Sequence, residues 1–258
     1  MKNILFTIAL LISYTSVYSQ CNLTLRSNSP SSKLLKGSNS SYINTKLDLE
    51  RLQLKKVFDV EFRIEYYPGN VAFAGPNCES SSCDGTIGLG VNLLEKLHNQ
   101  EKEGGVWMIL AILSHEAAHI FQYKNNLKFE NTVQQEIHAD FIAGWYMGKL
   151  MEDYKAMYDF SNSSSEAYNK MQDKLESISI FKQNLRMFFG SLGDSNYSSI
   201  DHHGNYITRS MAIHKGMKSY TGWAQPINTI TGESRDYKKL LITHGKSDAS
   251  DLIKEYNH

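Results

Sequence analysis

Two histidines stand four residues apart in the stretch Ser114–Gln122, and a glutamate directly follows the first of them. On a helix, side chains four residues apart project from one face, so His115 and His119 can reach one zinc ion. Glu116 between them can then act as base to a water molecule on that ion. The same pattern also arises by chance on helices that carry two unrelated histidines. The residues around it therefore decide between a metal site and an ordinary helix.

A zinc site that activates water needs a third protein ligand and one open position. The extended pattern with a third histidine fails here, because the two positions it specifies are Gln122 and Asn125. The remaining candidate is a carboxylate from another helix, and Glu136 supplies it. Asp140 shares a helix face with Glu136 and can accept a hydrogen bond from the outer nitrogen of a ligand histidine.

The alternative for this second helix is an ordinary solvated face that carries Glu136 and Asp140. The upstream motif favours metal ligation over that alternative. His138 lies two residues from Glu136 and points away from that face. We therefore expect His138 to be exposed or to be hydrogen-bonded behind the ligands.

A small sheet is expected ahead of the motif. Phe58–Glu65 alternates apolar and charged residues, which is typical of a half-buried strand. Pro68, Gly69 and Asn70 form a turn, and Val71–Ala74 and Thr86–Gly90 follow as further strands. The three strands are predicted to pair in an antiparallel sheet.

From residue 91 the pattern becomes helical. Val106–Leu113 is an unbroken apolar run that leads into the motif, too short to span a membrane and therefore predicted to be buried. Thr132–Leu150 carries an apolar stripe at helical spacing. Further helices are expected over Leu47–Lys56, Leu93–His98, Glu166–Phe189, Tyr206–Lys218 and Asp248–Tyr256. The sequence thus predicts a mostly helical α+β domain with a small antiparallel sheet before the helix that carries the motif.

The composition excludes a basic nucleic-acid-binding surface, because 27 Lys and Arg balance 27 Asp and Glu in the 258 residues. Residues 1–19 have a positive start and a short apolar run, which indicates a signal peptide. We expect a flexible, Ser- and Asn-rich segment over 20–45 and one domain over 46–258. The protein is therefore expected to be exported, to the periplasm or the outside, with no transmembrane helix in the mature chain.

Export permits disulfides, and the chain has three cysteines. Cys78 and Cys83 flank a short polar turn and are expected to pair. Cys21 directly follows the apolar segment, so a lipid anchor there is an alternative to a free or intermolecular thiol. Gln20 is a poor residue to precede a lipidated cysteine, which disfavours the lipid anchor.

Six segments resemble, in order, the bacterial neutral zinc metallopeptidases of the gluzincin type. They are also similar to the wider group with the CAAX prenyl endopeptidases and their heat-shock membrane relatives. The resemblance covers about residues 57–220, and the loop at Cys78–Cys83 is an insertion relative to the family. The matching segments are Asn70–Pro76, Gly85–Gly88, Leu93–Leu94, Ser114–Gln122, Glu136–Gly144 and His203–Arg209.

The resemblance implies a zincin-like domain that hydrolyses peptide bonds in protein or peptide substrates, with one catalytic Zn²⁺. It implies that Glu116 passes a proton from water to the leaving amine, and that Arg209 braces a carboxylate near the site. His203 would donate to the developing oxyanion, or else be a structural histidine at a helix start. The substrate would lie along an edge strand made of Val71, Ala72, Phe73 and Ala74. The alternative is that these residues form plain core sheet.

Two other functions stay open. One is a zinc-binding envelope protein without hydrolytic activity, and the other is a hydrolase of a non-peptide amide on the same scaffold. The first is disfavoured by Glu116, because a site that only binds metal needs no base beside its ligands.

Overall fold

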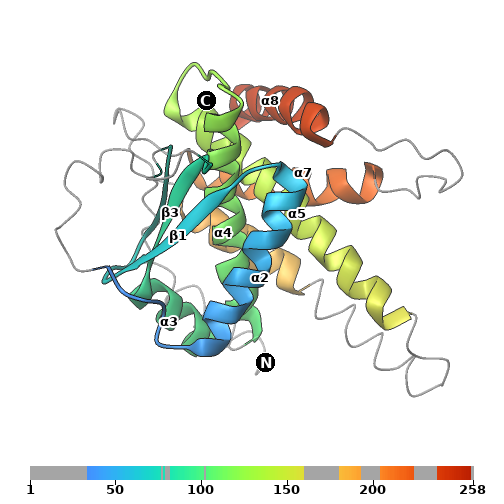
Figure 1. Cartoon of the computed structure of the whole chain (residues 1–258). Helices are drawn as coiled ribbons and strands as arrows, with labels where there is room; N and C mark the ends of the chain where they lie inside the picture. Colours follow the sequence, from blue (N-terminus) through green and yellow to red (C-terminus); the bar gives the residue numbers. More distant parts are fainter. Residues whose placement is uncertain are drawn as a thin grey trace, which may run out of the picture.

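The computed structural model describes residues 34–76, 78, 82–101, 103–159, 180–192, 204–223 and 237–256. The elements lie in the order predicted, a small sheet followed by helices, and the mostly helical α+β class is confirmed (Figure 1). The expected signal peptide, Cys21, His203 and residues 166–179 of an expected helix lie outside the described residues. The named elements are α2 (Ser41–Phe58), β1 (Phe62–Tyr67), β2 (Ala72–Gly75), β3 (Gly85–Gly90), α3 (Val91–Glu101), α4 (Glu103–Lys124), α5 (Thr132–Asp159), α7 (Tyr206–Trp223) and α8 (Tyr237–Tyr256).

The sheet is mixed, so the prediction of a purely antiparallel sheet was wrong. Its order is β1-β3-β2, with β1 parallel to β3 and β2 antiparallel to it. The connection from β1 to β2 crosses the end of β3, where the amide of Gly90 donates to the carbonyl of Val71 at 2.9 Å. A Cβ at Gly90 would lie 2.4 Å from the carbonyl oxygen of Gly69, so a glycine is required at this crossing. The fully buried β3 thereby takes the centre of the sheet.

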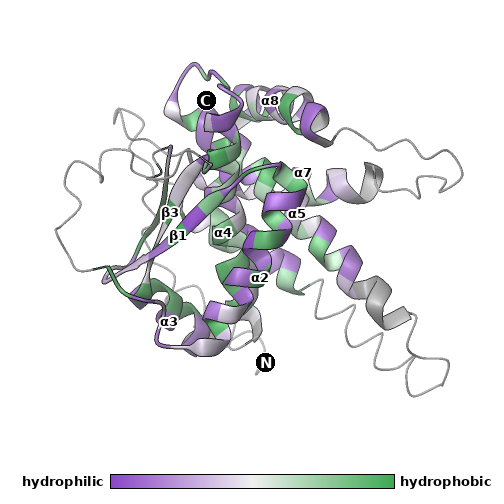
Figure 2. Cartoon of the chain, in the orientation of Figure 1, coloured by the Kyte–Doolittle hydropathy of each residue, from purple (hydrophilic) through white to green (hydrophobic). Residues whose placement is uncertain are grey.

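Helix α2 is longer than predicted and begins at Ser41, with the Ser40 side chain accepting from the amide of Ile43. It runs through Phe58, which was expected to start a strand, so β1 begins only at Phe62. Leu35 pairs with Tyr66 of β1, so the described part of the segment 20–45 contacts the domain. Figure 2 shows hydrophilic and hydrophobic residues alternating along α2, as expected for a helix that buries one face.

Helix α4 forms the centre of the fold and contacts β2, β3, α2, α3 and α5. Its segment Gly104–Lys124 is long and apolar enough to cross a membrane by length and composition, but 83% of the window is buried inside the fold. The prediction of a buried helix leading into the motif is confirmed.

Helices α5 and α7 pack with their backbones in close contact, because glycines of each helix face the backbone of the other. A Cβ at Gly144 would lie 2.2 Å from the carbonyl oxygen of Ile213, and one at Gly216 would lie 2.1 Å from that of Phe141. Real Cβ atoms do not approach backbone this closely, so both positions need glycine. This crossing sets Arg209 of α7 beside Asp140 of α5. Helix α8 packs on both α5 and α7 and starts at Tyr237, eleven residues before the expected Asp248.

Candidate metal centre

Helices α4 and α5 bring three potential metal ligands together. The Nε2 atoms of His115 and His119 lie 3.1 Å apart. The two carboxylate oxygens of Glu136 lie 3.4 Å from these nitrogens, Oε2 from His115 and Oε1 from His119. All three residues are at most 3% exposed, and one ligand atom from each falls within 4.8 Å of the others. This cluster could hold a metal ion.

The orientation of His115 is set by Asp140. The Nδ1 atom of His115 lies 2.9 Å from Oδ1 of Asp140, which can only accept, so Nδ1 carries the proton. Arg209 in turn donates to both oxygens of Asp140, from Nε at 2.8 Å and from Nη2 at 2.9 Å. The lone pair of His115 Nε2 is therefore directed toward the cluster.

The orientation of His119 is set by Gln122, one turn further along α4. The amide nitrogen of Gln122 lies 2.8 Å from the carbonyl oxygen of Gln135, which can only accept. Oε1 of Gln122 must therefore face Nδ1 of His119, 2.8 Å away, and that nitrogen carries the proton. The lone pair of His119 Nε2 thus also points into the cluster.

His138 closes this network and is fully buried rather than exposed. Its Nδ1 accepts from the amide nitrogen of Gln122 at 3.0 Å, and its Nε2 donates to the carbonyl of Leu241 on α8 at 3.3 Å. Burial lowers the pKa of His138 to about 3, so its ring is neutral. The two carbonyls of Gln135 and Leu241 thus determine which atoms of Gln122 and His138 donate and which accept.

The cluster favours positive charge at its centre. Burial lowers the pKa of His115, but hydrogen bonds to Asp140 and Glu136 outweigh it and raise this pKa to about 10. If a metal ion replaced the proton on His115, both ligand imidazoles would be neutral, and the described cluster would hold three carboxylates, Glu116 included, against one guanidinium, that of Arg209. A divalent cation would balance this excess of negative charge.

Glu116 is fully buried and follows His115 on α4. Burial raises the pKa of Tyr67, and the negative charge of Glu116 adds to the rise. The Tyr67 hydroxyl donates to the carbonyl of Val71 at 2.6 Å. The charge of the expected base therefore acts on a side chain that binds the segment leading into β2.

The expected substrate strand is at an edge of the sheet. Strand β2 pairs with β3 on one side, begins at Ala72 and contacts α4. Val71 precedes the strand, Ala72 and Ala74 are buried, and Phe73 is half-buried. His203 lies outside the described residues, directly before Gly204, which begins the described part of that segment.

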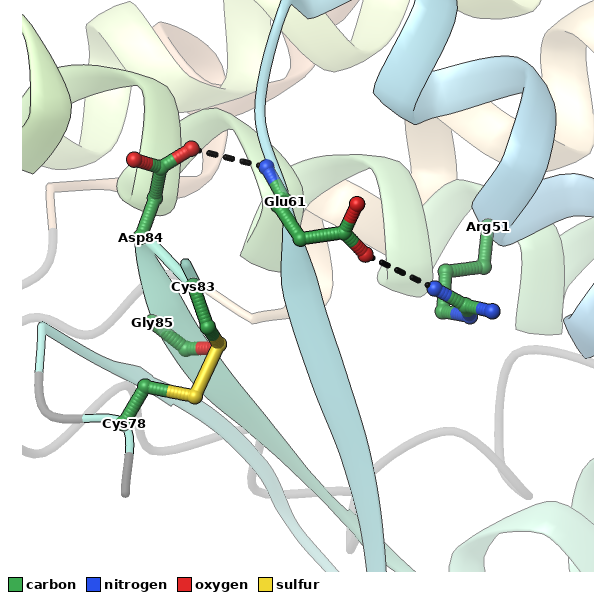
Figure 3. The surroundings of a disulfide bond; sticks show 6 residues. All are labelled: Arg51, Glu61, Cys78, Cys83, Asp84 and Gly85. Atoms are coloured by element: carbon green, nitrogen blue, oxygen red, sulfur yellow. Dashed lines mark hydrogen bonds and ion pairs between the residues drawn. A yellow bond between two sulfur atoms is a disulfide. The ribbon is translucent and has the colours of Figure 1, made fainter. Parts of the chain in front are cut away.

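The predicted disulfide between Cys78 and Cys83 is present, with Cα atoms 5.8 Å apart, and it closes the connection between β2 and β3 (Figure 3). Next to it, Asp84 accepts from the amide of Glu61 at 2.7 Å. Glu61 also pairs with Arg51 of α2 at 3.0 Å. The loop is thus attached both to the start of β1 and to α2.

Sequence reasoning missed the role of Gln122, which it used only to exclude a third histidine. Its spacing of three residues from His119 was a usable signal, because such residues are neighbours on a helix. The bond from His138 to α8 had no local signal.

Comparison with protein-family models, with curated proteins and with solved structures finds no match to this chain.

Proposed function

We propose that this chain is an exported, zinc-dependent endopeptidase in which His115, His119 and Glu136 hold the ion and Glu116 is the general base. One observation carries the proposal. Two histidine lone pairs and a carboxylate converge at 3.1–3.4 Å, while the protons of both rings are held on their far nitrogens. Such a convergence of acceptors is repulsive unless a proton or a metal cation lies between them.

Zinc fits the donor set of two imidazoles and one carboxylate better than the oxygen-seeking Mg²⁺ or Ca²⁺. A tetrahedral ion with bonds of about 2.0–2.1 Å separates its ligand atoms by about 3.3–3.4 Å. The two Nε2 atoms of the cluster lie 3.1 Å apart, and each lies 3.4 Å from a different carboxylate oxygen of Glu136, which is close to this spacing. Three protein ligands leave one position open, which is the arrangement of catalytic rather than structural zinc sites.

Bound zinc would polarise the scissile carbonyl and activate a water molecule near neutral pH. Glu116 takes the proton of that water and later delivers it to the leaving amine. Asp140 and Arg209 keep the lone pair of His115 on the side of the ion, and Gln122 does the same for His119.

Two further roles complete the proposal. His203 donates to the developing oxyanion; it directly precedes Gly204, where a Cβ would lie within 3.5 Å of Ile137 and Val133, on either side of Glu136 in sequence. An extended peptide or unfolded protein segment adds to the edge of β2 as a further strand. The place of action is the periplasm or the outside of the cell, with a lipid anchor at Cys21 as the alternative to a free chain.

The test is cleavage of a denatured protein and of a peptide library by the purified mature chain, with and without a chelator. Glu116→Gln should lower turnover by about 10²–10⁴-fold while zinc content is unchanged, because it removes the base and no ligand. Glu130→Gln is the matched control, since it makes the same change at an exposed carboxylate. Full zinc occupancy with no turnover on any substrate would refute the peptidase and favour a zinc-binding envelope protein. Turnover confined to small amides would favour the non-peptide hydrolase.

A further inference from the structure

A chain of hydrogen bonds connects the cluster of potential metal ligands to helix α8. It runs from Nδ1 of His119 to Gln122, from Gln122 to His138, and from Nε2 of His138 to the carbonyl of Leu241. Leu241 is 103 residues from His138 in the sequence. His119, Gln122, His138 and Leu241 are each at most 2% exposed, so water cannot substitute freely for any of these partners.

Helix α8 carries a glycine, Gly245, where the His138 ring approaches it. A Cβ at Gly245 would lie 2.9 Å from Nε2 of His138, so a larger residue would push the ring away from the helix. Gly245 stands one turn after Leu241, on the face that presents the accepting carbonyl.

The next residue of α8, Lys246, binds the loop whose Phe129 packs against the His138 ring. The ammonium of Lys246 donates to the carbonyl of Lys128 at 2.7 Å and lies 5.3 Å over the Phe129 ring. The centroid of Phe129 is in turn 5.2 Å from that of His138. His138 is thus enclosed between α8 and the loop that α8 binds.

We propose that α8 positions the metal ligand His119, with Gln122 and His138 as the positioning residues between them. The carbonyl of Leu241 fixes the proton of His138 on Nε2, so its Nδ1 requires a donor from Gln122. That requirement, together with the carbonyl of Gln135, keeps the Gln122 oxygen toward His119. If the Gln122 amide turned over, His119 would carry its proton on Nε2, in the place of the ion.

The inference rests on the metal binding of the proposed function but not on peptidase activity. Its test is the zinc affinity of purified protein, measured by competition with a chelator of known affinity, and the visible spectrum of the cobalt-substituted form. Gln122→Met keeps the volume but removes the acceptor, and we expect about 10–100-fold weaker zinc binding. The cobalt spectrum should shift, because the ring of His119 is no longer held in one orientation.

Two variants locate the effect at α8. Gly245→Ala should weaken zinc binding and shift the cobalt spectrum in the same direction as Gln122→Met, although it lies outside the cluster. His138→Asn keeps an acceptor for Gln122 but no longer reaches Leu241, and should give an intermediate affinity. These two variants also decide the matter if Gln122→Met does not fold.

Matched controls separate positioning from general stability. Tyr146→Phe removes another buried hydrogen bond of α5, the one to Glu50, and Gly148→Ala crowds another helix contact of α5, with Met217. Both controls should lower the thermal stability of the metal-free protein yet keep the wild-type zinc affinity and cobalt spectrum. Wild-type affinity and spectrum in Gln122→Met, His138→Asn and Gly245→Ala would overturn the positioning role and leave the proposed function standing. Failure of the wild-type protein to bind zinc would overturn both.

Discussion

Arg209 pairs with two of the three carboxylates of the site, Asp140 and Glu136, and its removal tests the electrostatic reasoning most directly. Its guanidinium makes two hydrogen bonds to Asp140 and lies 3.6 Å from Oε2 of Glu136. The side chains of Arg209 and Asp140 are 2% and 0% exposed. Arg209→Met keeps most of the aliphatic volume and leaves the buried Asp140 with His115 as its remaining partner.

The expected cost follows from this burial. Removing one partner of a buried, hydrogen-bonded ion pair costs about 3–5 kcal/mol, because the other charge stays desolvated. A unit charge pair at about 4 Å and an effective dielectric constant of about 20 gives about 4 kcal/mol, which agrees. Such a loss is a large part of the total stability of about 5–15 kcal/mol that is usual for a domain.

The assay is equilibrium unfolding in denaturant of the metal-free protein. Arg51→Met is the matched control, because Arg51 pairs with Glu61 at 3.0 Å with both side chains 29% exposed. We expect the control to lose no more than about 1 kcal/mol. Arg209→Lys, which keeps the charge but not the two-pronged geometry, should fall between wild type and Arg209→Met and serves if the latter does not fold.

Adding Asp140→Asn to Arg209→Met should recover part of the loss, because the carboxylate charge that has lost its guanidinium is then removed. The reasoning is refuted if Arg209→Met costs about as little as Arg51→Met, or if the double variant is less stable than Arg209→Met alone.

Three further outcomes are expected. Glu136→Ala should sharply reduce zinc content measured by metal analysis; unchanged content would show that the third ligand is another residue. Burial raises the pKa of Glu50 above its usual 4.5, so the folded protein binds this proton more tightly than the unfolded chain and stability falls as the pH rises above about 4.5. Glu50→Gln should therefore stabilise the protein near pH 7 and flatten this dependence in unfolding curves; a steeper dependence would contradict the sign. Gly216→Ala should cost at least about 1–3 kcal/mol in denaturant unfolding, because the new Cβ meets the carbonyl of Phe141, and a neutral effect would show that the α5–α7 crossing adapts.

The ligands were predictable because their spacing is local. His115 and His119 are one helical turn apart, as are Glu136 and Asp140, so helical periodicity alone puts each pair on one face. The fold class followed from the same periodicities, with period two over Phe58–Glu65 and helical spacing after residue 91.

The pairing of the strands was not predictable in this way, because it depends on a contact between separate segments. Nothing local to Phe62–Tyr67 shows that the following turn will cross the end of β3. The decisive feature is Gly90, and its role is visible only when the carbonyls of Gly69 and Val71 lie against it. His138 likewise acquires its partner from α8, over a distance in sequence that no periodicity covers.

The separation in sequence between His138 and Leu241 also sets the order in which the hydrogen bonds around the site can form. Gln122 and His138 are 16 residues apart and belong to two consecutive helices, so the α4–α5 pair can close over a short loop. The bond from His138 to Leu241 closes only when the chain through α8 is present, 103 residues later. During synthesis from the N-terminus, His115, His119 and Glu136 are therefore complete as a set before the carbonyl of Leu241 that binds His138 has been made. A chain that ends before residue 237 would keep all three ligands and lose the α8 carbonyl that fixes His138.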